Sequence, residues 1–529
     1  MGVAAVISAK VFLLPGFHDY TIAVLAESKT RFFAAAVVLT TVVLVVVALV
    51  MAWHAFPLLG DDSSCFVPVA INLKNGLGLV NPTDIHAYLT DPLASMSLGH
   101  ARFLYYPPMF EAVLALLMGK GTVMAAYHAL GLLGAGALIA TACLLWRRVK
   151  TQRPPDGWAV LGVLFSLPGL MSYLLTGTNG RPEVLTMIWV CGWAGILFFM
   201  DNRRPVLKDL ALLGVLSLQM CTQPISAVLG GIGVALYLFR VWEPKKALFH
   251  TIMVAFGCVA LFLMFLALSP GGLSVHLSAM RSEAHQIMGL GGFEQAYFVR
   301  MYLTGPHFTG YGLILVAAFA AMLLRIFDDA PPPGRRWVSV GLVLVLLAAL
   351  QYFVFQFAAR NYNIFALMPL LFLGNLDLLM TWPSRLGGDW QKPVRGLVLL
   401  ATAITGIGFV RKLLMFGFFL AYGVSLPQAQ LDFQHVLPQA HGPVYFTDSL
   451  WVLSDDNRNM RFWADRVHSP PKGTGMLVVQ NNVFPSATPP VVSGYKLIFS
   501  SFSTRRPTLF GHSLALYMPG YGFAAYVPQ

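Results

Sequence analysis

Two adjacent carboxylates, Asp61 and Asp62, lie a few residues beyond the first long apolar segment of the chain. They stand out because charged residues make up only 11% of the sequence, against roughly a quarter in average soluble proteins. A carboxylate at a lipid–water boundary can remove a proton from a hydroxyl as a general base, and crowding of two like charges would raise the pKa of one of them. The structural alternative is that one Asp, ahead of Ser63-Ser64, caps an interfacial helix beginning near Phe66.

A second candidate group is the turn Gly180-Arg181-Pro182-Glu183. Pro182 suits the first turn of the helix expected to follow, and Glu183 suits the positive end of that helix. Arg181 is the only cation in its loop, which predicts that it binds a phosphate or pairs with Asp61. Glu183 is also a candidate for the second acidic residue of a site.

The first large loop contains a polar cluster that includes Arg102, Tyr105 and Tyr106. Aromatic rings stack on sugars and an arginine forks onto phosphate, so these residues could form a sugar-and-phosphate surface. The alternative is that the sequence YYPP makes a stiff entry to a helix. His86, His100 and nearby acids match no specific metal-ligand spacing, so we expect solvated loop residues and no metal.

Further cations lie in later loops and at one span end. Arg281 and His285 belong to an amphipathic run that could clamp a lipid-linked phosphate, or could simply be a surface helix. Arg360 lies at the outer end of an expected span, and Arg411 and Lys412 interrupt an apolar segment. The alternative for these three is that they reach out to lipid headgroups.

The elements that must position these residues are membrane helices. Hydrophobic residues make up 57% of the chain and the mean hydropathy is +0.68, so we expect an all-α polytopic bundle with a small C-terminal α/β domain. The expected domains are a cytoplasmic segment 1–31, an amphipathic helix on the membrane face; a membrane domain 32–425 with outer loops 57–121 and 269–307; and an outer domain 426–529. About eleven spans are expected, near 32–56, 122–146, 158–175, 183–200, 207–221, 224–241, 247–268, 308–327, 337–357, 361–380 and 396–421.

Basic residues define the expected orientation. They crowd the connections 146–157, 201–209, 239–250, 325–337 and 382–395 and are nearly absent from the alternate ones, which places the N-terminus in the cytoplasm and the C-terminus outside. The segment 106–118 is apolar but too short to span, so an interfacial helix is expected there. The net charge of +12 is explained by these loops and by membrane lipids, and predicts no nucleic-acid partner.

The C-terminal 100 or so residues have short apolar runs separated by turn residues. The runs at 444–448, 476–480, 495–501 and 522–527 read as strands, and the polar stretch 448–466 as helix or loop. A lid or acceptor-docking module without chemistry of its own is the favoured interpretation of this domain.

Several chemical signatures are absent from the sequence. It has no phosphate-binding Walker loop, no dinucleotide fingerprint and no HExxH motif, which disfavours an ATP-driven pump or a zinc protease. The first loop also lacks DxD, so a donor that needs no metal and no cofactor would suit it.

Taken together, the pattern resembles the GT-C superfamily of integral-membrane glycosyltransferases, near the protein mannosyltransferase and aminoarabinose transferase branch. The matching features are the acidic pair after the first span, the long first outer loop, the Tyr106-Pro107-Pro108 turn, the Gly180–Glu183 turn and the C-terminal outer domain. The resemblance covers the architecture of essentially the whole chain, and its motifs are short.

The resemblance implies an inverting transfer of a sugar from a polyprenyl-phosphate carrier to a hydroxyl of a glycan, lipid or protein acceptor in the cell envelope. It implies Asp61 or Asp62 as the base, with Arg181 and Glu183 in the second-loop site; charge and position alone make Arg102, Arg281 and Arg360 candidates for holding the lipid phosphate. The absence of N-glycosylation sequons favours a bacterial inner membrane. The alternatives are a transporter or lipid flippase, which would show an internal repeat and charges within spans, and a ligase or polymerase of lipid-linked glycans.

Overall fold

The structure is a computed structural model of the 529-residue chain. The residues that it describes are 15–59, 61–81, 107–151, 156–176, 180–201, 203–269, 272–278, 281, 366–380, 388–447, 450–456, 459–463, 470, 473–480, 489–502, 508–509, 512–513 and 520–529.

The described part is mainly helical, and its helices are those of an integral membrane protein. Six apolar stretches are long enough to cross a membrane, and three shorter apolar helices accompany them within the described part. The helices are α2 (Pro15–Trp53), α7 (Val123–Val149), α8 (Gly157–Thr176), α9 (Glu183–Phe199), α10 (Pro205–Thr222), α11 (Pro224–Val241), α12 (Pro244–Leu268), α18 (Met368–Met380), α19 (Gln391–Thr405) and α20 (Ile407–Tyr422). The expected total of about eleven spans is not confirmed, since 308–327 and 337–357 lie outside the described residues.

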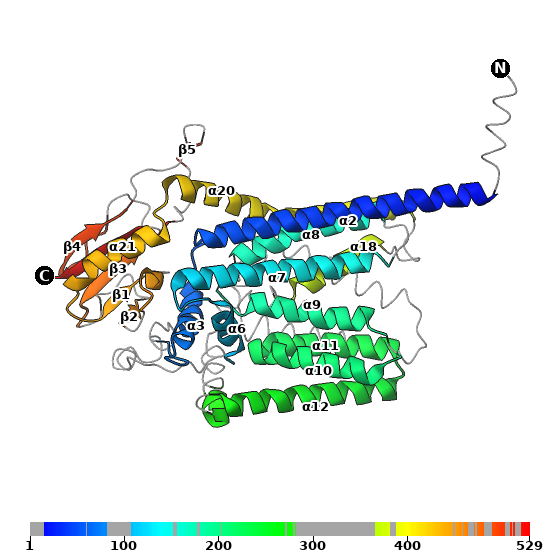
Figure 1. The fold of residues 1–529 in the computed structure, drawn as a ribbon, viewed down its shortest axis with the longest axis horizontal. Helices are drawn as coiled ribbons and strands as arrows, with labels where there is room; N and C mark the ends of the chain where they lie inside the picture. Colours follow the sequence, from blue (N-terminus) through cyan, green and yellow to red (C-terminus); the bar gives the residue numbers. More distant parts are fainter. Residues whose placement is uncertain are drawn as a thin grey trace, which may run out of the picture.

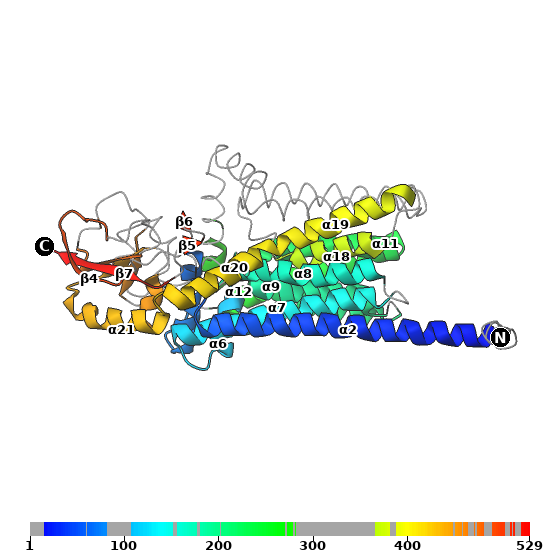
Figure 2. The same cartoon turned by 90° about the horizontal axis from the view of Figure 1, so that it is seen from above.

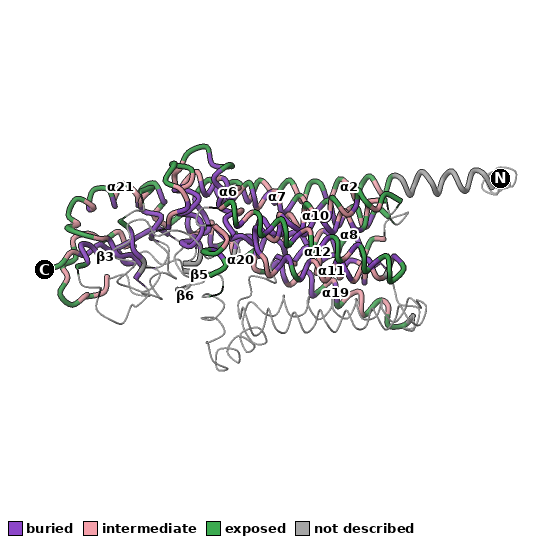
Figure 3. Tube along the Cα trace, turned by 90° about the horizontal axis from the view of Figure 1, so that it is seen from below, coloured by how far each residue is buried: buried purple, intermediate pink, exposed green. Residues whose placement is uncertain are grey.

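The membrane helices lie side by side in one bundle (Figures 1 and 2). Small residues let neighbours approach closely, as in other membrane proteins: a Cβ on Gly131 of α7 would lie 2.6 Å from the Cβ of Ala52 on α2. Figure 3 shows exposed positions recurring along α2. Apolar side chains such as Leu39 on α2 and Phe256 on α12 are 66% and 76% exposed, as expected of helices that face lipid.

A proline and a helix break face each other in the bundle. Pro168 lies inside α8, where it removes a helical hydrogen bond and favours a bend. Gly406 separates α19 from α20, and a Cβ on Gly406 would lie 3.3 Å from the Cβ of Pro168. The two irregularities therefore pack together.

Charged residues of the connections gather at one end of the bundle. At the end away from the C-terminal domain, Arg148 pairs with Asp377 at 2.8 Å and Arg395 pairs with Asp156 at 3.3 Å. Lys208 is buried there and donates to the carbonyl of Leu197, near the end of α9, at 2.9 Å. The start of α9 and the α10–α11 connection lie at the opposite end, the one nearer the C-terminal domain, with α3 and α6 in between (Figure 1). This grouping agrees with the charge pattern from which the orientation was predicted.

Two short elements follow the first span. A 3-10 turn, η1 (Asp61–Cys65), leads into α3 (Val67–Lys74), and α6 (Met109–Leu117) packs against α3. At nine residues α6 is too short to cross a membrane, which matches the short helix expected near 106–118. The expected separate helix in 1–31 differs from the structure, because α2 runs without a break from Pro15 into the first span.

The C-terminal part forms a mixed sheet beside a helix, α21 (Leu426–Val436). The sheet order is β2-β1-β3-β7-β4, with β1 parallel to β2 and β3 and with β7 antiparallel to β3 and β4. The strands are β1 (Val444–Phe446), β2 (Met460–Phe462), β3 (Met476–Gln480), β4 (Tyr495–Ser500) and β7 (Phe523–Pro528); β5 (Thr508–Leu509) and β6 (His512–Ser513) form a separate pair, and short 3-10 turns η3 (Gly388–Trp390), η4 (Leu437–Gln439) and η5 (Leu450–Leu453) complete the elements. The four predicted strands are confirmed, and β2 and η5 fall in the stretch predicted as helix or loop.

Candidate functional site

The acidic pair belongs to η1, which follows the end of α2 after a short connection that begins with a turn at His54–Ala55. Asp61 and Asp62 are its first two residues, and their side chains lie outside the described part. The far end of η1 is fixed by Asn81, which is buried and whose amide donates to the carbonyls of Ser64 and Cys65 at 3.0 and 3.2 Å. The helix α3 starts later, with Phe66 at the N-cap position and no side-chain cap, so neither Asp occupies the capping position of α3.

The Gly180–Glu183 turn packs directly against η1. Gly180 has φ +77°, and a Cβ there would lie 2.8 Å from the Cβ of Ser63 and 2.9 Å from Cδ2 of Leu59. Both the backbone conformation and the close approach require glycine. Two loops that are far apart in sequence are thereby held together at one end of the bundle, as the prediction of a shared site requires.

Arg181 and Glu183 form a buried ion pair. Arg181 donates from Nε and Nη2 to the two carboxylate oxygens of Glu183 at 3.2 and 3.3 Å, and the side-chain amide of Gln223 donates to Oε1 of Glu183 at 3.0 Å. Arg181 is 6% and Glu183 1% exposed. Glu183 is the first residue of α9, as predicted, where the helix dipole favours its negative charge.

A buried ion pair does not by itself stabilise a fold. Removing two charges from water costs several kcal/mol per ion, and their attraction repays this only with good geometry and added hydrogen bonds. The two-pronged contact of Arg181 and the amide of Gln223 supply those bonds for Glu183. The result is a rigid cation–carboxylate unit beside the acidic turn, a suitable arrangement for fixing a phosphate or a sugar.

Glu111 is a buried acid that the sequence reasoning missed. It lies in the first turn of α6, is 0% exposed, and neither of its oxygens has a hydrogen-bond partner in another residue of the described chain. Burial raises the pKa of the Glu111 carboxyl to about 8, so the neutral form, which can donate a hydrogen bond, prevails at neutral pH. The sequence feature that could have revealed Glu111 is an acidic residue in a short segment that is otherwise apolar.

The ring of Phe66 lies between the first turn of α6 and the buried ion pair. The ring of Phe110 meets the ring of Phe66 edge-on at 6.2 Å, and the guanidinium of Arg181 lies 5.8 Å from the centre of that same Phe66 ring. Glu111 is the next residue after Phe110. Three segments therefore converge: η1 with α3, the Gly180–Glu183 turn, and the start of α6.

The C-terminal domain covers this end of the bundle. Tyr521 donates to the carbonyl of Ala55 and shares a 2.5 Å hydrogen bond with the hydroxyl of Tyr127, which also accepts from the backbone N–H of Leu59 at 3.1 Å. A carboxylate oxygen of Asp455 accepts from the N–H of Val123 at the start of α7 at 2.8 Å. The domain is thus anchored to the residues immediately before the acidic turn.

The other predicted site residues are not brought together by the described structure. Arg102, Tyr105, Tyr106, His285 and Arg360 lie outside the described residues, as do His86 and His100. Arg281 is described and exposed. Within the described ranges, no group of three or more His, Cys, Asp or Glu residues is arranged to hold a metal ion.

Comparison with known proteins identifies no relative: no family model, no curated protein and no solved structure matches the chain.

Proposed function

We propose that this protein is an inverting glycosyltransferase that moves a sugar from a polyprenyl-phosphate carrier to a hydroxyl of an envelope acceptor. In this proposal the reaction takes place at the end of the bundle covered by the C-terminal domain, which faces outward from a bacterial inner membrane. The observation that supports it most is the contact of Gly180 with Ser63 and Leu59, because it joins the acidic turn to the Arg181–Glu183 pair.

The proposed chemistry is a single displacement. Asp61 or Asp62 takes the proton of the acceptor hydroxyl while the acceptor oxygen forms a bond to the anomeric carbon. The bond from that carbon to the carrier oxygen breaks, and the electron pair leaves with the carrier phosphate. A cation close to that phosphate stabilises the growing charge where water is scarce. Arg181, held in place by Glu183, belongs to the turn that packs against the acidic turn.

The two alternative functions gain less support from the described residues. A transporter or flippase would carry its ionisable groups within paired, interrupted spans. The interruptions here are in α8 and between α19 and α20, whereas the buried ion pair lies at the start of α9. A glycan ligase or polymerase would share the side of reaction, and the chemistry of the products distinguishes it from the proposed transferase.

The experiment is complementation of a deletion strain of the source organism, read by mass spectrometry of envelope glycans and lipids. The wild-type gene restores the sugar missing from the deletion strain, and the double variant Asp61→Asn/Asp62→Asn, although present in the membrane at normal amounts, does not. Asp389→Asn, at an exposed acid in η3, serves as the matched control and restores it. No missing sugar in the deletion strain, or full restoration by the double variant, would overturn the proposal.

A further inference from the structure

The segment that joins α2 to the acidic turn begins with an unusual backbone conformation. Ala55 has φ +55°, in the left-handed region that favours glycine. It ends α2 with a hydrogen bond typical of helix C-termini, from the N–H of Phe56 to the carbonyl of Met51 at 2.9 Å. An alanine in this conformation is strained, and such strain persists only where the surrounding contacts fix the backbone.

Two buried tyrosines supply those contacts. Tyr521 of the C-terminal domain donates to the carbonyl of Ala55, and its hydroxyl also bonds to that of Tyr127 at 2.5 Å. The N–H of Leu59 donates to the hydroxyl of Tyr127 at 3.1 Å. Each hydroxyl has one proton, and a carbonyl can only accept, so Tyr127 must donate to Tyr521, whose own proton goes to Ala55. Three hydrogen bonds in one direction therefore bridge the two ends of the segment 55–59.

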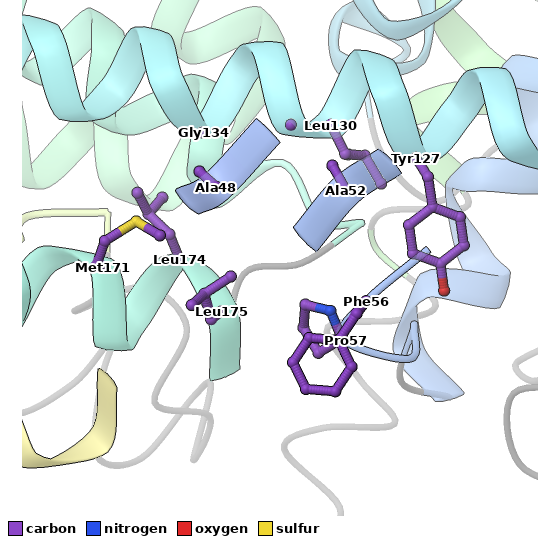
Figure 4. Close-up of a pocket in the computed structure, with 11 residues that line it drawn as sticks. Ala48, Ala52, Phe56, Pro57, Tyr127, Leu130, Gly134, Met171, Leu174 and Leu175 are labelled. Atoms are coloured by element: carbon purple, nitrogen blue, oxygen red, sulfur yellow. The ribbon is translucent and has the colours of Figure 1, made fainter. Parts of the chain in front are cut away.

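The bridged segment adjoins both groups of the candidate site. Leu59 is two residues before Asp61, and a Cβ on Gly180 would lie 2.9 Å from Cδ2 of Leu59. On the bundle side, Tyr127 and Phe56 line one small cavity between α2, α7 and α8, and the Tyr127 hydroxyl points away from α7 (Figure 4). A shift of this segment would therefore move the acidic turn relative to the turn that contains Gly180.

We propose that Tyr521 and Tyr127 are positioning residues, which hold the segment 55–59 so that the acidic turn meets the substrates in the correct place. This role depends on the proposed function, in which the acidic turn provides the base. Reacting groups must be held within about 0.5 Å of the productive geometry, and a displacement of about 1 Å can slow a reaction about 100-fold. The C-terminal domain thereby contributes to the reaction itself, beyond covering the end of the bundle.

Hydrogen exchange of the full-length protein, followed by mass spectrometry, measures the hold on this segment independently of sugar transfer. Tyr521→Phe keeps the ring but leaves the carbonyl of Ala55 without its donor, and Tyr127→Phe leaves the N–H of Leu59 without its acceptor. Peptides that cover the segment and η1 should exchange about ten-fold faster in both variants.

Tyr526→Phe is the matched control for the exchange experiment. Tyr526 is also buried in the C-terminal domain, and its hydroxyl donates to the carbonyl of Pro490 at 2.7 Å. Its replacement removes a bond of the same kind within the domain and should leave exchange of the segment 55–59 unchanged. Wild-type exchange of that segment in Tyr521→Phe would overturn the proposal, whether or not the protein transfers sugar.

Sugar transfer at saturating donor then tests the consequence for the reaction, with each rate divided by the number of sites that bind polyprenyl phosphate. A purely structural role would lower the number of sites and leave the rate per site unchanged. We expect the rate per site to fall about 10- to 100-fold in Tyr521→Phe and Tyr127→Phe, and to stay at the wild-type value in Tyr526→Phe.

Two outcomes of the transfer experiment separate this role from the proposed function. A wild-type rate per site in Tyr521→Phe, together with faster exchange, would refute the positioning role and leave the proposed function intact. Absence of transfer by the wild type would instead refute the proposed function and, with it, a role of the tyrosines in catalysis.

Discussion

Replacing Glu111 by glutamine should make the protein more stable, and increasingly so as the pH rises. The folded state holds the proton of Glu111 up to about pH 8, whereas an unfolded chain releases it near pH 4.5. From pH 4.5 to 8 the folded state therefore binds more protons than the unfolded state, and wild-type stability falls as the pH rises through this window. At 1.36 kcal/mol per pH unit, the loss reaches at most about 5 kcal/mol.

Glutamine keeps the size of the side chain and cannot ionise, so Glu111→Gln escapes this loss. Thermal unfolding of the wild type and the variant in detergent at pH 5, 6, 7 and 8, followed by circular dichroism, measures the difference. The two proteins should be similar at pH 5, and the variant should unfold at a clearly higher temperature at pH 8. Asp389→Asn, at an exposed acid, should show no such divergence. Parallel curves for Glu111→Gln and the wild type across this range would refute the assignment of a buried, unpaired carboxyl.

Three further substitutions test the packing of the site. Gly180→Ala should destabilise the protein, because φ is +77° and the added methyl group meets the neighbouring turn. The backbone strain alone costs about 1–3 kcal/mol, and the close contact adds to it. An unchanged unfolding midpoint would contradict the close contact. Arg181→Ala should lower the free energy of unfolding by about 3–5 kcal/mol, because it leaves Glu183 buried and unpaired. The double variant Arg181→Met/Glu183→Leu should regain most of that stability without regaining sugar transfer. Sugar transfer by the double variant would exclude a role for the pair. Tyr521→Phe should lower stability by about 1–3 kcal/mol, measured as above, whereas Tyr422→Phe, at an exposed tyrosine, should have little effect.

The helices were largely predictable because hydropathy and turn residues act locally. The start of α9 at Glu183 follows from the turn at Gly180 and from Pro182 directly before the helix. The short length of α6 follows from an apolar run of insufficient length. The continuity of α2 was missed, because the apolar run that begins after Arg31 suggested a boundary there, and a helix can cross such a change in polarity without interruption.

That the Gly180–Glu183 turn lies beside the acidic turn was predictable, but the contacts of its residues were not. Arg181 was expected to bind a phosphate or Asp61, and the described pair with Glu183 depends on the backbone turn that aligns the two side chains. Gln223 and Glu111 were not predicted, since the bond from Gln223 to Glu183 and the burial of Glu111 depend on how α10 and α6 pack, which residue spacing along the chain does not reveal.

The most direct test of the proposed reaction is sugar transfer by the purified protein in proteoliposomes, with the sugar identified in the deletion strain supplied on a polyprenyl phosphate. The wild type should release the carrier phosphate and form the glycosylated acceptor in equal amounts. Asp61→Asn/Asp62→Asn should form neither product at a measurable rate while retaining the wild-type unfolding temperature. Undiminished transfer by that double variant would show that the carboxylates of the first outer turn are not the base.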